Sequence, residues 1–281
     1  MKKYSEVSGD GGSGILEQVS GQLGALHERM RGIKRVIVIV SAKGGVGKSF
    51  ITAMMAKALS NRGYSVGALD ADINGSSIPY MLGVDSYKAI RGENGIIPAV
   101  GECGAKVMSL DFFTGSNGAP VKWEGPQATH PWLGAMEATA IRELLSDADW
   151  GQLDYLLVDT PPSLGRLNDL MGLVPSVSGV VIVTIPSKVS YRVVLKSVDS
   201  VRDTGAPIIG VVENMSGVLC RHCNKMAPIF NGGDMTEALD FMRLPLLGSV
   251  PFVREGESME IPEAAINGIC DKTVAYVNSA G

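Results

Sequence analysis

The stretch RVIVIVSAKGGVGKS, from Arg35 to Ser49, carries the strongest structural signal in this sequence. Its first part, Arg35–Val40, is an unbroken run of β-branched residues after the initial arginine, which predicts a buried strand. The glycines after it predict a loop, and a helix is expected from Lys48 to Asn61, ending before Gly63. A strand, a glycine-rich loop and a helix in this order are the setting in which backbone N–H groups hold a phosphate.

Apolar strands alternate with helical segments along the rest of the chain. Strands are expected at Ser65–Leu69, Lys106–Leu110, Tyr155–Val158, Val180–Ile185, Ile208–Val212 and Leu246–Val250. Helices are expected at Ala135–Leu145, at Lys188–Arg202 and from near Pro262. This alternation is typical of a parallel sheet covered on both faces. We therefore predict an α/β fold: a single-domain P-loop NTPase over residues 33–281, with a mostly parallel sheet flanked by helices on both faces.

The residues before this domain have a different pattern. Residues 1–14 are polar and rich in glycine, and we expect a disordered tail. Apolar residues at helical spacing predict an amphipathic helix over residues 15–32, which would pack on the domain or on a partner.

Composition and charge narrow the classes of function. Apolar residues make up 45% of the 281, enough for a well-buried core. The net charge is −4 and no basic face is visible, so we expect no nucleic-acid partner. We see no signal peptide, and no apolar run approaches the roughly 20 residues that a membrane helix needs. The protein is therefore predicted to be cytoplasmic, without a membrane partner.

Four of the predicted strands end on polar residues. In a parallel sheet, ligands bind at the carboxyl ends of the strands. Those ends carry the loop Lys43–Ser49, Asp70 with Asp72, Asp159, and Glu213-Asn214. The apolar strand that ends on Asp159 has the pattern of a Walker B strand, whose carboxylate would hold Mg²⁺ through water. We predict a magnesium–nucleotide site at this edge of the sheet.

The residues of the loop have distinct expected roles. Glycines allow backbone N–H groups to converge on phosphate oxygens, and the following helix adds its partial positive charge. Lys48 would reach the β- and γ-phosphates, and the Ser49 hydroxyl would ligate Mg²⁺. The predicted nucleotide-binding residues of the loop are Lys43, Gly44, Gly45, Val46, Gly47, Lys48 and Ser49.

Two features of the loop depart from the usual G-x-x-x-x-G-K-[ST] pattern. Its first glycine is replaced by Ala42, and an extra lysine stands at Lys43. The form K-G-G-V-G-K-S resembles the deviant loop of the MinD/nitrogenase-iron-protein class. That resemblance implies a face-to-face dimer in which Lys43 reaches the nucleotide of the other subunit and stabilises charge on the transferred phosphoryl group.

The same resemblance assigns roles to residues that follow other strands. Asp72 would position the attacking water, and Asp70 would support the magnesium shell. Asn214 resembles the residue that contacts adenine in this class, which favours ATP over GTP. The implied catalytic residues are therefore Lys43, Lys48 and Asp72.

A second chemical signal is the pair Cys220 and Cys223, in a segment near residues 216–230 that would be inserted into the domain. Two thiolates at C-x-x-C spacing can bind one metal or cluster but cannot complete a four-cysteine site. A symmetric dimer would supply four thiolates at its axis. Zinc fits this spacing as well as an iron–sulfur cluster does, and a redox disulfide is a weaker alternative.

Longer motifs extend the resemblance over most of the chain. These motifs are Leu69–Ile73, Ser77-Ile78-Pro79, Asp149–Tyr155, Glu213–Ser216, Cys220-x-x-Cys223 and Pro245–Gly248. From about Ile33 to the C-terminal helix, the chain resembles the Mrp/ApbC family of iron–sulfur carrier ATPases. The resemblance implies a homodimer that binds a bridging [4Fe–4S] cluster on its two cysteine pairs. It also implies ATP-dependent transfer of that cluster to apo iron–sulfur client proteins.

The chain departs from the family pattern at three places. Ser163–Arg166 replace the family's Gly-Thr-Gly-Asp, Glu124 stands where an arginine is expected, and Phe50 stands where a second hydroxyl is common. Because the first of these segments senses the γ-phosphate in the family, we expect slow ATP hydrolysis.

The main alternative function is a MinD- or ParA-like positioning or regulatory ATPase with a structural metal on the cysteine pair. Such a protein should carry a basic amphipathic C-terminal helix or a basic DNA-binding face, and Lys272–Gly281 contain a single lysine. A nitrogenase-reductase-like electron donor would use cysteines from separate segments. Cys103 and Cys270 are instead expected in the core.

Overall fold

The computed structural model describes residues 24, 26–41, 43–72, 75–113, 130–161, 167–174, 176–220, 222–223, 225–230, 235–253 and 259–279. Of residues 130–137, 169 and 188–191 it describes the backbone alone. The predicted tail, most of the predicted N-terminal helix, Glu124 and Ser163–Arg166 lie outside the described residues. Residues 26–30 are helical and lie next to β1, with Leu26 and Met30 buried.

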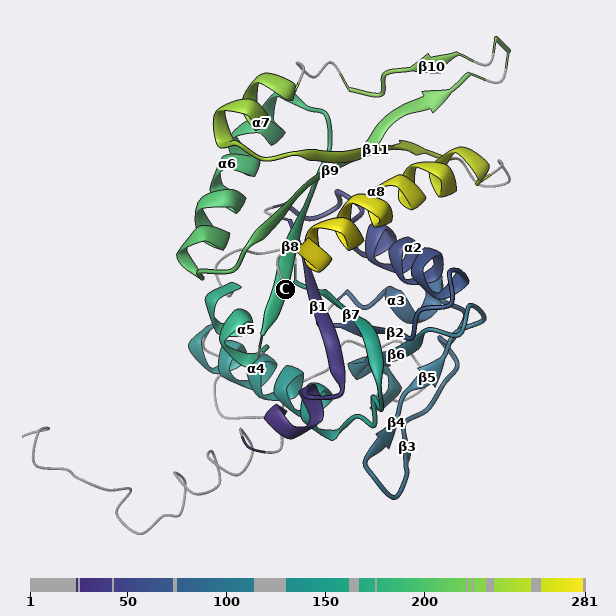
Figure 1. Cartoon of the computed structure of the whole chain (residues 1–281), viewed down its shortest axis with the longest axis vertical. Helices are drawn as coiled ribbons and strands as arrows, with labels where there is room; N and C mark the ends of the chain where they lie inside the picture. The colour runs from purple at the N-terminus through teal and green to yellow at the C-terminus, as the bar shows by residue number, and fades with distance from the viewer. Residues whose placement is uncertain are drawn as a thin grey trace, which may run out of the picture.

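The described strands form one nine-stranded sheet and a small hairpin (Figure 1). The strands of the large sheet are β1 (Ile33–Val40), β2 (Val66–Asp70), β5 (Ala99–Val100), β6 (Lys106–Ser109), β7 (Leu153–Asp159), β8 (Val177–Thr184), β9 (Ile208–Leu219), β10 (Met226–Ala227) and β11 (Leu246–Phe252). Their order is β10-β9-β8-β1-β7-β2-β6-β5, and β11 also pairs with β9. The pairs β5–β6 and β9–β10 are antiparallel, and the other pairs are parallel. The hairpin consists of β3 (Ile90–Arg91) and β4 (Ile96–Ile97).

Helices cover both faces of the sheet (Figure 1). One face carries α4 (His130–Asp147), α5 (Leu167–Leu173), α6 (Lys188–Asp203) and α7 (Thr236–Met242). The other carries α2 (Lys48–Asn61), α3 (Ile78–Met81) and α8 (Glu260–Ser279). A short 3₁₀ helix covers Leu110–Phe113. The predicted α/β architecture, a mostly parallel sheet between two helical layers, is confirmed.

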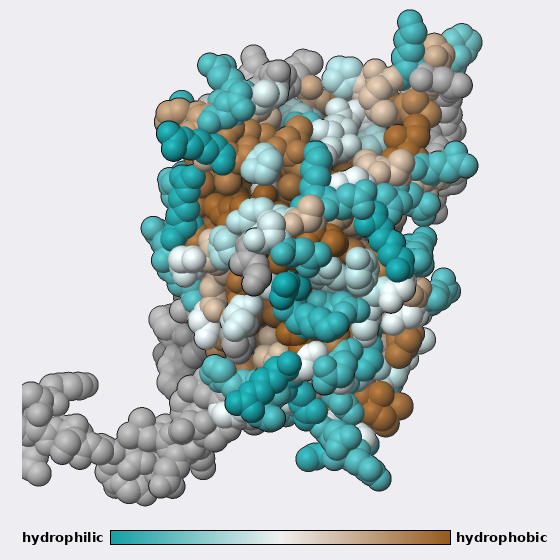
Figure 2. All heavy atoms as spheres, viewed as in Figure 1, coloured by the Kyte–Doolittle hydropathy of each residue, from teal (hydrophilic) through white to brown (hydrophobic). Residues whose placement is uncertain are grey.

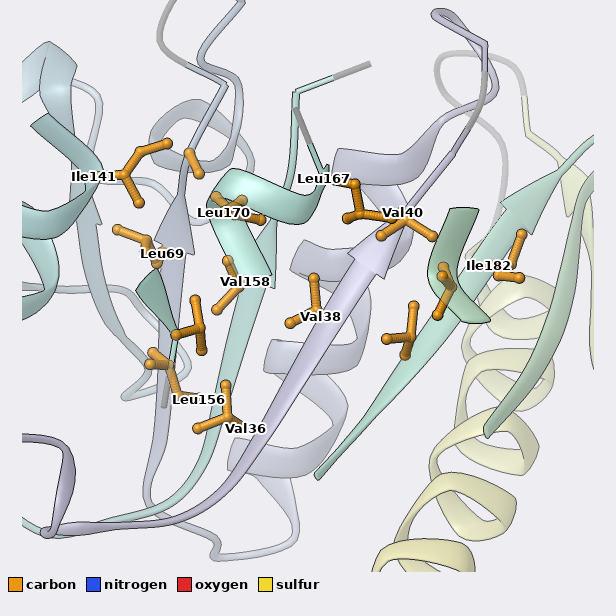
Figure 3. Packing of buried hydrophobic residues seen from close by; sticks show 14 of the residues in the cluster. Val36, Val38, Val40, Leu69, Ile141, Leu156, Val158, Leu167, Leu170 and Ile182 are labelled. Atoms are coloured by element: carbon orange, nitrogen blue, oxygen red, sulfur yellow. The ribbon is translucent and has the colours of Figure 1, made fainter. Parts of the chain in front are cut away.

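The residues of the central strand β1 explain why helices must bury both faces of the sheet. Successive side chains of a strand point to opposite faces. Val36, Val38 and Val40 belong to one buried cluster, whereas Ile37 and Ile39 belong to the other. Figure 3 shows the first set side by side with apolar residues of β2, β7 and β8, under Leu167 and Leu170 of α5. A strand that is apolar on both faces is therefore buried on both, and its carboxyl end is fixed in place.

Several elements differ from the prediction. Strand β9 was expected to end at Val212 but continues to Leu219, because β11 and β10 supply pairing partners beyond the end of β8. Helix α4 begins at His130, earlier than expected, and α8 at Glu260. The prediction contained no element at α3, β3–β5, α5, β10 or α7. Within the described part of the chain, no helix is long and apolar enough to cross a membrane.

Candidate nucleotide site and cysteine hairpin

The glycine-rich loop connects β1 to α2 at the carboxyl edge of the sheet, as the sequence predicted. Gly45 and Gly47 have φ values of 77° and 79°, in the left-handed region that side chains disfavour. Gly47 is the N-cap residue of α2, and its carbonyl accepts the Ile51 N–H at 3.0 Å. The loop therefore directs the N-terminus of a long helix towards the site where phosphates would bind.

A buried carboxylate organises the groups just behind the loop. Asp159, at the end of β7, is fully buried. Its Oδ1 accepts hydrogen bonds from Lys48 Nζ at 2.6 Å and from Thr52 Oγ1 at 3.0 Å. Its Oδ2 accepts one from Ser49 Oγ at 2.5 Å. Lys48 is 5% exposed, so its ion pair with Asp159 is almost completely shielded from water.

The oxygen atoms in this cluster suit a magnesium ion. Mg²⁺ prefers hard oxygen donors, commonly one or two protein groups together with waters and phosphate oxygens. The Ser49 hydroxyl and the Asp159 carboxylate are in contact with each other at the start of α2. Two predicted magnesium residues are thus brought together.

Asp70, at the end of β2, is also buried and lies beside Asp159. Burial, followed by repulsion from Asp159, raises its pKa from 3.8 to about 7. Its Oδ2 accepts hydrogen bonds from Ser76 Oγ at 2.8 Å and from the backbone N–H groups of Ser77 and Ile78 at 2.9 and 3.0 Å. Its Oδ1 accepts the Asp72 N–H at 3.1 Å. In this structure Asp70 therefore anchors both ends of the segment from Asp72 to Ile78.

The remaining predicted catalytic residues lie at the rim of the site. Lys43 is exposed at the start of the loop, and its carbonyl accepts a hydrogen bond from Ser41 Oγ at 3.1 Å. Asp72 is half-buried, and its carbonyl accepts the Gly75 N–H at 3.2 Å.

Asn214 packs directly against the loop. Its side chain is buried, and Nδ2 donates to the Val46 carbonyl at 2.9 Å. A Cβ atom on Gly47 would lie 2.1 Å from this nitrogen, so a larger residue at that position would have to displace the Asn214 amide. Asn214 was expected to follow its strand, but it lies inside β9, at the point where pairing with β8 has ended. The contact with the loop was not predicted.

Strand β9 has a bulge immediately after this contact. Met215 has φ 55°, which is rare for a residue with a side chain. The register with β11 shifts between the pairs Asn214–Val250 and Val218–Phe252. Beyond the bulge, Val218 pairs with β11 on one side and with β10 on the other.

The cysteine pair lies in the turn between β9 and β10. Leu219 pairs with Met226, and the Cys220 N–H donates to the Lys225 carbonyl at 2.9 Å. Cys220 is half-buried and Cys223 is exposed, and neither forms a disulfide. The hairpin projects from the body of the sheet (Figure 1). The sequence had placed the pair in an insertion, and the structure places it at the end of a continuous ribbon.

Apolar side chains surround this turn. Met226, Ile229 and Phe252 are large hydrophobic residues with between 40% and 48% exposure. Hydrophobic atoms are visible over the same ribbon in Figure 2. By contrast, Cys270 lies on α8 and is buried against the core, and burial raises the pKa of its thiol to about 12. Cys103 is half-buried beside the same core. The expectation of core positions for these two cysteines holds.

Sequence reasoning missed Thr52 and Ser76. Thr52 lies four residues after Lys48, on the same helix face, and that spacing is a signal that could have been used. Ser76 reaches Asp70 only through the fold of a loop, and no spacing rule indicates it.

Comparison with known proteins identifies the family. The family model described as "ParA: NUBPL iron-transfer P-loop NTPase" matches residues 32–267. The chain belongs to this family. Members of the NUBPL family are NTPases by description, in agreement with the loop geometry and with the predicted ATPase class.

Curated relatives carry consistent names. The chain is 42% identical to the iron–sulfur cluster carrier protein of Methanocaldococcus jannaschii over 84% of this chain and 80% of that protein. It is 38% identical to the cytosolic Fe–S cluster assembly factor CFD1 of Eremothecium gossypii, over 80% of this chain and 79% of that one. These names agree with the carrier prediction rather than with the positioning-ATPase alternative.

Solved structures support the fold. A nucleotide-binding protein of Archaeoglobus fulgidus in complex with ADP superposes with a TM-score of 0.70 at 29% identity, over 88% of this chain and 92% of that one. The cell division ATPase MinD of Pyrococcus furiosus has a TM-score of 0.58 at 22% identity, over 86% and 99% of the two chains. The second similarity shows a shared fold alone.

Proposed function

We propose that this protein is an ATP-dependent iron–sulfur cluster carrier, which binds a [4Fe–4S] cluster and transfers it to apo-proteins. The observation that carries the proposal is the position of Cys220 and Cys223 at the end of the β-ribbon that also contacts the phosphate loop. The names of the relatives and the family description support it. Since several relatives are named cytosolic factors, we also propose that it works in the cytoplasm.

The nucleotide is held by the loop Lys43–Ser49. Backbone N–H groups and Lys48 would bind the phosphates, while Ser49 and Asp159 would hold Mg²⁺, which would polarise the phosphate oxygens when bound. Asp70 supports that site from behind by anchoring the segment 72–78. To reach a phosphate, the Lys48 ammonium must break its ion pair with Asp159. Both charged groups of the pair are then available to the magnesium–nucleotide ligand.

Hydrolysis requires two further residues at the rim. Asp72 positions the attacking water, and Lys43 stabilises the developing charge on the nucleotide of the partner subunit. Asn214 contacts adenine through its carbonyl oxygen, since one N–H of its amide donates to the Val46 carbonyl and holds the side chain beside the loop. Adenine recognition would make ATP the nucleotide.

The cluster is cargo, and its binding calls for two copies of the chain. A [4Fe–4S] cluster takes four thiolates, and each chain offers two in the hairpin turn. Among the described residues, no group of three or more His, Cys, Asp or Glu side chains is placed to hold a metal. A homodimer with the two turns at its axis supplies the full set. The exposed thiol of Cys223 and its apolar surroundings leave the cluster accessible to a client.

Anaerobic reconstitution with iron and sulfide tests the proposal. The purified protein is expected to gain a broad visible absorption band and about two irons per chain, as for one cluster shared by two chains. Cys220→Ser and Cys223→Ser should each abolish both, whereas Cys103→Ser, a matched control outside the hairpin, should retain them. Zinc in place of iron, or iron retained in both hairpin variants, would contradict the carrier function.

A further inference from the structure

The buried hydroxyl of Thr52 has no place in the functions assigned so far. Thr52 lies on α2, one turn after Lys48, and is fully buried. Its Oγ1 is 3.0 Å from Asp159 Oδ1 and 3.1 Å from the Lys48 carbonyl. Its neighbours on α2, Ile51 and Ala53, are buried apolar residues. A polar atom in such surroundings is costly unless it has a specific partner.

The hydroxyl has one proton and two nearby acceptors. A hydrogen bond to an ionised carboxylate is stronger than one to a neutral carbonyl, and the carboxylate here is fully buried. The proton therefore goes to Asp159, and the Lys48 carbonyl is left as a close neighbour that does not receive it. Thr52 is thus the third donor to this carboxylate, after Lys48 and Ser49.

Nucleotide binding would affect the hydrogen bonds of these three donors to Asp159 differently. Lys48 is required by the phosphates, and Ser49 by the magnesium ion, according to the proposed function. Thr52 faces neither ligand, because it lies one turn deeper in the helix and is closed off from solvent. When a nucleotide enters, Thr52 is the donor that stays with Asp159.

We propose that Thr52 is a positioning residue for magnesium-dependent nucleotide binding. By holding Oδ1, it keeps Asp159 in the orientation that directs Oδ2 to the Ser49 side of the site after the lysine has left. This inference rests on the proposed magnesium site. It adds that the orientation of Asp159, rather than its charge alone, sets the affinity for the ion.

Substitution of Thr52 by valine tests this proposal, because valine has nearly the same shape and lacks the hydroxyl. Thr273→Val is the matched control: Thr273 is also fully buried, and its hydroxyl donates to the carbonyl of the residue four positions earlier, Ile269, at 2.8 Å, with no carboxylate involved. Thr52→Ser restores the hydroxyl without the methyl group. Thermal melts without nucleotide establish that all three variants are folded.

The measurement is the binding of a fluorescent ADP analogue, first in EDTA and then across a magnesium titration. Thr52→Val should raise the half-saturating magnesium concentration about tenfold, because a hydrogen bond to a charged group is lost. It should leave the affinity for the ADP analogue in EDTA within about twofold of that of the unmodified chain. Thr52→Ser and Thr273→Val should match the unmodified chain. Equal magnesium dependence for the unmodified chain and Thr52→Val would overturn the inference, as would an equal loss of affinity in EDTA. If magnesium had no effect on the unmodified chain, the proposed magnesium site itself would fail.

Discussion

Replacement of Gly47 by alanine should destabilise the nucleotide-free protein through two separable effects. The first is backbone strain, because Gly47 has φ 79° and a left-handed conformation costs a residue with a Cβ about 1–2 kcal/mol. The second is collision: the new Cβ would lie 2.1 Å from Asn214 Nδ2 and must displace it. Displacement breaks the hydrogen bond to Val46 and leaves a buried amide without that partner, at about 1–3 kcal/mol. We expect a total loss of about 2–5 kcal/mol.

Gly45 provides a control that isolates the first effect. Its φ is 77°, nearly that of Gly47, but a Cβ there would meet no atom within 4 Å. Gly45→Ala should therefore cost only the backbone strain of about 1–2 kcal/mol. Urea unfolding without nucleotide measures both losses on the same scale.

A double variant, Asn214→Ala with Gly47→Ala, then tests the role of Asn214. In an Asn214→Ala background the collision is absent, so adding Gly47→Ala should cost no more than Gly45→Ala costs in the unmodified chain. Equal losses for Gly45→Ala and Gly47→Ala in the unmodified chain would refute the reasoning. It would mean that Asn214 does not restrain the loop.

Three further predictions concern other parts of the molecule. Lys43→Ala should leave ADP affinity within about twofold and reduce steady-state ATP turnover at least about hundredfold, if its charge acts on the transferring phosphoryl group as proposed; equal turnover would remove it from catalysis. Asp70 stays protonated in the folded protein up to about pH 7 but ionises near pH 4 in the unfolded chain. The free energy of unfolding of the nucleotide-free protein should therefore fall as pH rises towards 7, by at most about 1.4 kcal/mol per pH unit. Urea titrations at several pH values measure this slope, and Asp70→Asn should flatten it. Arg243 is the exposed C-cap residue of α7 and has φ 56°, a left-handed conformation that favours glycine. In thermal unfolding, Arg243→Gly should therefore stabilise the protein by about 0.5–1 kcal/mol, whereas Arg243→Ala should give no gain.

The sequence predicted the central part of this structure well because local and tertiary signals agree there. Helix α2 occupies the expected residues, Lys48–Asn61, since a glycine loop precedes it and Gly63 follows it. The buried parallel strands were recognised because β-branched runs with apolar residues on both faces have few alternative structures. Asp70 and Asp159 were predicted at strand ends, and the structure brings them together because β2 and β7 are neighbours in register.

The prediction failed where tertiary contacts override local pattern. Residues 213–217, ENMSG, lack the alternation of a strand, so β9 was ended too early. It continues because pairing with β11 stabilises it and the positive φ of Met215 accommodates the bulge. The contact between Asn214 and Val46 joins residues far apart in sequence, and no spacing rule could have indicated it.

The unbroken path of β9 has a mechanical consequence. Asn214 and Cys220 lie six positions apart, at most about 20 Å at the rise of a strand because the bulge at Met215 shortens the path, and the ribbon projects from the sheet beyond β8. If the ribbon moved as one rigid body, its base would be the contact between Asn214 and the phosphate loop, and its tip would be the cysteine turn. A rotation of about 5° at Asn214 would carry the cysteines through about 2 Å, comparable with the length of an iron–sulfur bond. The two sites would therefore not need to touch: in the proposed homodimer, a small movement of the loop would be enough to change the distance between the two cysteine turns.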